Sequence, residues 1–147
     1  MIAITPTDAV LGATVEGVDA SGPVDEATFG ALLNALGRYG VLRFPDQNLD
    51  AAKLKRFSER FGEIQGGIGE KRKSDVPEVG VLSNVRENGD LIGLPDAGQD
   101  WHTDMSYRDV IGFVNVLYGV MVPRRGGRVL GGTEFANMHL AYEQLPA

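Results

Sequence analysis

"VDEATFGALLNALGRYGVLRF", residues 24–44, predicts a helix that leads directly into a short buried strand. Four apolar residues recur at the spacing i, i+3, i+4, i+7 and therefore share one helix face: Phe29, Leu32, Leu33 and Leu36. Such a stripe is typical of a helix that packs against a core. Asp25 or Glu26 can begin the helix and Gly40 can end it. We therefore expect a helix over 25–38, with "VLRF" as the strand that follows.

A second helix and a further strand are predicted on either side of this unit. In "NLDAAKLKRFSERFG" one face carries three apolar residues: Leu54, Phe57 and Phe61. Asp50 is a suitable N-cap and Gly62 a suitable stop, so we expect this helix over 50–61. "ATVEGV", residues 13–18, alternates and is β-branched, which predicts a strand.

The rest of the chain predicts mainly strands and loops. Residues 65–75 are rich in glycine and charge, which favours an exposed, mobile loop. "VGVLSNV", residues 79–85, is a strand candidate. "GFVNVLYGVMVP" is apolar on both faces, so we expect a strand over 112–122 in the middle of a sheet. A last helix is expected in "TEFANMHLAYEQLP", residues 133–146. These elements together predict a fold that mixes helices and strands.

Composition narrows the class of protein. The chain has 147 residues, which suits a single domain over 1–147, and its net charge of −6 argues against nucleic-acid binding. It contains no cysteine, so disulfides and thiolate metal sites are excluded. We see neither a signal-peptide pattern at the N-terminus nor an apolar run of membrane-spanning length. A soluble cytoplasmic protein without a membrane partner is the expectation.

"WHTDMSY", residues 101–107, contains the candidate metal ligands. Side chains two positions apart on a strand point to the same face, so His102 and Asp104 would project together. An imidazole and a carboxylate on one face are two parts of the 2-His-1-carboxylate triad that holds Fe(II). Taken alone, a His-x-Asp motif is more often a hydrogen-bonded pair on the surface or in the core than a metal site. The other histidine, His139, lies on a predicted helix and is a poor candidate for a third ligand.

Several ordered motifs resemble the TauD/TfdA family of Fe(II)- and 2-oxoglutarate-dependent dioxygenases. They are the opening "LGATVEGVD", the strand "VLRFPDQ", the helix end "RFGE", the strand "VLSNV", the metal motif "WHTDMSY" and the segment "GGTEFANMHLAYEQLP". The resemblance implies an α+β fold: a partial double-stranded β-helix, a jelly-roll of the clavaminate synthase-like kind, flanked by the helices expected over 25–38 and 50–61. It also implies hydroxylation of a small organic substrate, with release of succinate and CO2.

The resemblance assigns roles to three residues. His102 and Asp104 align with two iron ligands, and Thr133 aligns with the threonine that binds a carboxylate of 2-oxoglutarate. Gly132 stands where family members usually have an aspartate. Sulfonate-using members have other residues at the position of Gly98 and in the segment after "RFGE". Taurine is therefore not the expected substrate.

The family's distal histidine and its oxoglutarate-clamping arginine belong to a C-terminal half that this sequence does not contain. A loop before Thr133 contains three arginines that match no clamp position: Arg124, Arg125 and Arg128. Three readings follow: a portion of a dioxygenase, a non-catalytic truncated remnant, or a cupin-like binding module, of which the family motifs disfavour the last. With only about five or six strand candidates, where such a barrel needs roughly eight, we expect a homo-oligomer or a partner chain that completes the sheet.

Overall fold

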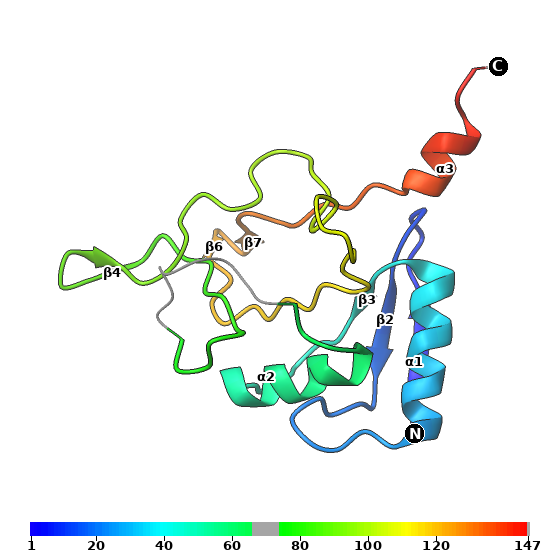
Figure 1. The fold of residues 1–147 in the computed structure, drawn as a ribbon, viewed down its shortest axis with the longest axis horizontal. Helices are drawn as coiled ribbons and strands as arrows, with labels where there is room; N and C mark the ends of the chain where they lie inside the picture. Colours follow the sequence, from blue (N-terminus) through cyan, green and yellow to red (C-terminus); the bar gives the residue numbers. More distant parts are fainter. Residues whose placement is uncertain (66–73, 147) are drawn as a thin grey trace. The chain divides into compact units, whose positions relative to one another are not determined.

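The computed structural model describes residues 1–65 and 74–146, which divide into two compact units. The first unit joins Met1–Asn48 to Gly119–Ala147, and the second is Leu49–Tyr118. The predicted loop over 65–75 falls mostly on residues 66–73, outside the described part of the chain. Figure 1 shows the course of the chain.

The first unit is built on a three-stranded sheet in the order β1-β2-β3. Strand β1 (Ala3–Pro6) pairs antiparallel with β2 (Ala13–Glu16), and β2 pairs parallel with β3 (Leu42–Arg43). A parallel pair needs a crossover connection, and here α1 (Glu26–Tyr39) provides it (Figure 1). The helix predicted over 25–38 and the strands predicted before and after it are confirmed, with small changes of boundary.

The core of the described residues lies between β2 and α1. Alternate β2 residues, Ala13 and Val15, are buried, as the two-residue period of a strand requires. The helix contributes Phe29, Leu32 and Ala35, and Leu32 is fully buried. Asp25 begins α1 by accepting a hydrogen bond from the Thr28 backbone N–H at 2.9 Å.

The part of the first unit that follows Gly119 contains short, exposed elements. Strands β6 (Arg124–Arg125) and β7 (Arg128–Val129) form a hairpin. Helix α3 (Met138–Glu143) begins at Asn137, whose side chain caps the Leu140 N–H. The helix predicted over 133–146 is therefore confirmed only in its middle, and its six residues include no buried side chain.

The second unit contains α2 (Ala51–Ser58), which a 3-10 turn (Glu59–Phe61) extends. Asp50 caps it, and the rings of Phe57 and Phe61 meet edge to face with centroids 5.6 Å apart. The helix predicted over 50–61 is therefore confirmed. A tight hairpin of β4 (Arg86–Glu87) and β5 (Asp90–Leu91) follows, turning at Asn88 and Gly89.

Two predicted strands are wrong in this structure. Over 79–85 only Leu82 makes a bridge, to Leu94. Residues 112–122 form no strand, and most of their large apolar side chains, including Phe113 and Val120, are exposed. A strand that is apolar on both faces needs strands beside it, and within 1–65 and 74–146 none pairs with this segment. The described residues form an α+β arrangement of small sheets, so the jelly-roll stays a prediction.

Candidate metal centre

His102 and Asp104 lie together although no strand places them there. Residues 101–104 belong to neither helix nor strand, so the expected strand position is wrong. Their side chains still converge, with His102 Nε2 3.2 Å from the Asp104 Oδ1 atom. Both side chains are about half exposed, at 52% and 53%. The pair is therefore accessible from solvent, as a site that admits an ion must be.

The backbone holds the His102 ring in one orientation. Its Nδ1 lies 2.7 Å from the Asp100 carbonyl oxygen, which can only accept, so Nδ1 carries the proton and donates. In the neutral ring Nε2 then has the free lone pair, and it is Nε2 that faces Asp104. Nothing in the sequence signals this support, because any residue at position 100 has a carbonyl.

The surroundings of His102 favour its charged form when no metal is bound. The hydrogen bond to the Asp100 backbone, and next the Asp104 charge, raise the pKa of His102 above its ordinary value of 6.5. Asp104 meanwhile receives a hydrogen bond at its second oxygen, Oδ2, from the Asn115 side-chain amide. Sequence reasoning missed Asn115, since nothing in the periodicity of its segment links it to the metal motif.

The two donor atoms fit a divalent metal ion. Ligand atoms about 2.1 Å from one ion and at right angles to each other lie about 3 Å apart. The separation of His102 Nε2 and Asp104 Oδ1, 3.2 Å, is close to this spacing. One neutral nitrogen and one carboxylate oxygen also match the donor types of non-haem iron sites.

In residues 1–65 and 74–146 no further histidine, cysteine or acid joins the pair to form a metal-binding group of three. His139 lies on α3 in the first unit, whereas His102 and Asp104 lie in the second. Thr133, the predicted oxoglutarate contact, is exposed in the loop between β7 and α3. That Thr133 shares a cavity with the pair stays a prediction.

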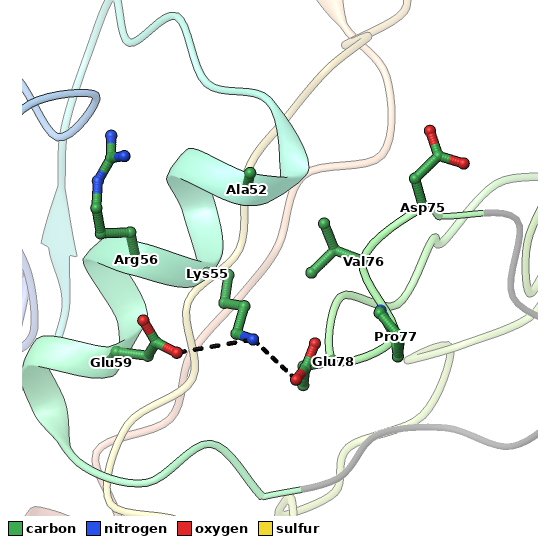
Figure 2. Close-up of a pocket in the computed structure, with 8 residues that line it drawn as sticks. All are labelled: Ala52, Lys55, Arg56, Glu59, Asp75, Val76, Pro77 and Glu78. Atoms are coloured by element: carbon green, nitrogen blue, oxygen red, sulfur yellow. Dashed lines mark hydrogen bonds and ion pairs between the residues drawn. The ribbon is translucent and has the colours of Figure 1, made fainter.

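An open cleft in the second unit lies between α2 and the segment 75–78, and Figure 2 shows its lining. Lys55 stands between Glu59 and Glu78, with Nζ 2.8 Å from the Glu78 carboxylate and 3.8 Å from Glu59. Its hydrogen bond to Glu78 raises the pKa of Lys55. These charges bind one another and fasten the segment to α2. Neither His102 nor Asp104 lines the cleft, so we assign it a structural role.

None of the helices in the described part of the chain is long and apolar enough to cross a membrane.

Comparison with known proteins places the chain in a family. The model for "Taurine catabolism dioxygenase TauD, TfdA family" matches residues 3–147. Pentalenolactone F synthase of Streptomyces avermitilis is 37% identical over 92% of this chain and 45% of its own length. The (S)-phenoxypropionate/alpha-ketoglutarate-dioxygenase of Delftia acidovorans is 34% identical over 97% of this chain and 48% of its own length. The chain thus spans about half the length of these relatives.

A crystal structure of AAD-2 in complex with Mn(II) and N-oxalylglycine is 27% identical and covers 45% of this chain and 26% of its own, with a TM-score of 0.43. Because the family model covers nearly the whole sequence, the match does not depend on the metal motif alone. The chain belongs to the TauD/TfdA family.

Proposed function

We propose that this chain is part of an Fe(II)- and 2-oxoglutarate-dependent dioxygenase that hydroxylates a small organic substrate. His102 and Asp104 are its iron ligands, and Thr133 binds a carboxylate of 2-oxoglutarate. The observation that carries the proposal is the 3.2 Å approach of His102 Nε2 to Asp104 Oδ1. Family membership and the names of relatives such as the phenoxypropionate/alpha-ketoglutarate-dioxygenase support it.

The residues prepare the site for a cation. The Asp100 carbonyl keeps the proton of the neutral His102 ring on Nδ1, so that Nε2 is available as a ligand. The Asp104 carboxylate supplies the negative charge that attracts the ion. Bound iron would supply the redox chemistry with oxygen and oxoglutarate. The Thr133 hydroxyl can donate a hydrogen bond to an oxoglutarate carboxylate.

We also propose four finer features that the sequence or the family resemblance suggests. These are a single domain over 1–147, a jelly-roll sheet, iron as the native metal and a cytoplasmic location. The unbroken family match over residues 3–147 supports the single domain. The relatives' names span a phenoxypropionate dioxygenase and a pentalenolactone synthase, so the substrate class stays broad.

The test uses the only tryptophan of the chain, Trp101, which directly precedes His102. Its side chain is 70% exposed, and a paramagnetic ion bound at the neighbouring pair would quench its fluorescence. We would titrate the 147-residue chain with Co(II), a redox-stable substitute, and then with Fe(II) under anaerobic conditions. Saturable but weak quenching is expected, because in the described residues only two protein donors converge.

The second histidine gives a matched control. His102→Ala should abolish saturable quenching, whereas His139→Ala should leave it unchanged. Saturable quenching that persists in the His102→Ala variant would count against the proposed site, and so would its absence from the wild-type chain. Succinate release from 2-oxoglutarate with iron and ascorbate, with phenoxypropionate among the substrates tried, then measures the activity itself.

A further inference from the structure

Asn115 contacts the candidate metal pair from a segment outside the metal motif. Its side-chain Nδ2 donates a hydrogen bond to Asp104 Oδ2 across a separation of eleven residues. Asp104 Oδ1, the other oxygen of the same carboxylate, faces His102 Nε2. The two oxygens of Asp104 are thus divided between two partners. All three residues lie in the second compact unit, Leu49–Tyr118.

The two different partners of the Asp104 oxygens affect how this carboxylate can bind a metal ion. A free carboxylate can rotate and can bind an ion with one oxygen or with two. A hydrogen bond on Oδ2 holds the plane of the group and leaves Oδ1 to bind the ion through one atom. Single-oxygen binding keeps more positions on the ion open, as an enzyme that must also admit a co-substrate requires.

An amide also suits this position electrostatically. Asn115 donates a hydrogen bond without bringing a charge, so Asp104 keeps its full negative charge for the ion. A lysine or arginine in the same place would compete with the ion for the carboxylate. The arrangement parallels that of His102, whose Nδ1 donates to the Asp100 carbonyl. Each candidate ligand thus forms one hydrogen bond through the atom that is not expected to bind the metal ion.

We propose that Asn115 is a positioning residue that orients the Asp104 carboxylate for single-oxygen binding of a divalent metal ion beside His102. This rests on the proposed function, since it assumes that His102 and Asp104 bind the metal. It adds a residue to the site that the metal motif does not contain.

The experiment measures Co(II) affinity through Trp101 quenching in the full 147-residue chain. Asn115→Leu removes the hydrogen bond while keeping a similar size, and we expect its affinity to fall by about 10–100-fold. Asn115→Gln keeps the amide and should recover part of the affinity, which a change in packing alone would not explain. Asn34→Leu, on the exposed face of α1, is the matched control and should bind as the wild type does.

The outcomes separate this proposal from the proposed function. If wild-type binding requires His102 while Asn115→Leu binds as tightly as wild type, the Asn115 proposal is wrong and the metal site stands. If the wild-type chain shows no His102-dependent binding, both fall. Circular dichroism checks that the variants fold. Should Asn115→Leu lose structure, Asn115→Ala replaces it, and wild-type affinity in that variant overturns the proposal equally.

Discussion

Met105, the residue after Asp104, has a φ of 59°, in the left-handed region that residues with side chains seldom adopt. Its carbonyl accepts from the Arg108 N–H at 3.1 Å, and the Tyr107 hydroxyl donates to its sulfur at 3.7 Å. This turn begins immediately after Asp104, the second candidate ligand. We therefore expect the backbone conformation of Met105 to help set the position of Asp104.

A β-branched residue should disturb this turn. Met105→Val places a β-branched side chain where φ is positive, a conformation that such residues adopt even less readily than methionine, so Co(II) affinity should fall, by about tenfold where the added cost reaches about 1.4 kcal/mol. Met105→Gly should retain the affinity, because glycine adopts this conformation freely. Met121→Val, at an exposed methionine without a positive φ, serves as the control. Equal affinity in the valine and glycine variants at position 105 would show that the turn does not position Asp104.

The pKa of His102 gives a pH prediction with a definite sign. The Asp100 backbone hydrogen bond and the Asp104 charge raise this pKa above 6.5, so the imidazole stays protonated to a higher pH than usual. Metal binding needs the neutral ring, and Co(II) affinity should therefore fall as pH decreases through the raised pKa. Without metal, the favourable pairing of charged His102 with Asp104 is fully present below 6.5 and is lost as pH rises through the raised pKa.

Proton NMR measures the pKa of His102 directly. In His139→Ala the only remaining imidazole signals belong to His102, since the chain has two histidines. The titration midpoint should lie above 6.5, and Asp104→Asn should lower it by removing the second-largest cause of the shift. A midpoint that does not respond to Asp104→Asn would contradict the pairing of the two side chains.

At the level of residues, the sequence predicted the pair His102 and Asp104 but not the groups that form hydrogen bonds with it. The i, i+2 spacing predicted His102 and Asp104 as a pair, and their side chains do meet, although no strand forms there. Asn115 and the Asp100 carbonyl have no such signal. One depends on how two segments meet, and the other is a backbone atom that every residue has.

Among the elements, helix α1 was predicted best because its signals are local. The apolar stripe, the Asp25 cap and the Gly40 stop all lie within or beside the helix itself. Residues 79–85 and 112–122 read as strands from their own composition, but a strand forms only when another strand pairs with it. In the described residues the first makes one bridge and the second none. Pairing depends on distant segments, which local patterns do not report.

Two glycines at one end of α1 should respond oppositely to alanine. Gly40, the C-cap, has a φ of 71°, and a Cβ there would lie 2.7 Å from Leu11 Cδ2. Gly40→Ala should therefore destabilise the chain by about 1 kcal/mol or more. Gly37 lies within the helix with open space around it, so Gly37→Ala should stabilise by about 0.5–1 kcal/mol. Urea denaturation followed by circular dichroism compares the two, and changes of the same sign would contradict the assigned cap.

At the scale of the whole molecule, the buried apolar side chains of residues 1–65 and 74–146 are concentrated in a small part of the chain. Seven of the core residues lie in the segment 13–35, and Phe57 adds one on α2. Between 110 and 122 most of the large apolar side chains are exposed, among them Phe113 at 71%, Val120 at 86% and Met121 at 79%. Exposed apolar segments of this size promote association. We therefore expect the 147-residue chain to self-associate and to bind the dye ANS as its concentration rises.

A double variant tests this expectation without changing the small core. Phe113→Lys with Val120→Lys places two charges in the exposed segment and should shift the chain to monomer in size-exclusion chromatography, with weaker ANS fluorescence. Asn34→Lys with Asn84→Lys adds the same charge at exposed polar positions and should leave association unchanged. If both variants dissociate equally, net charge rather than the apolar segment governs association. A wild-type chain that is monomeric and does not bind ANS would mean that these side chains are covered in solution.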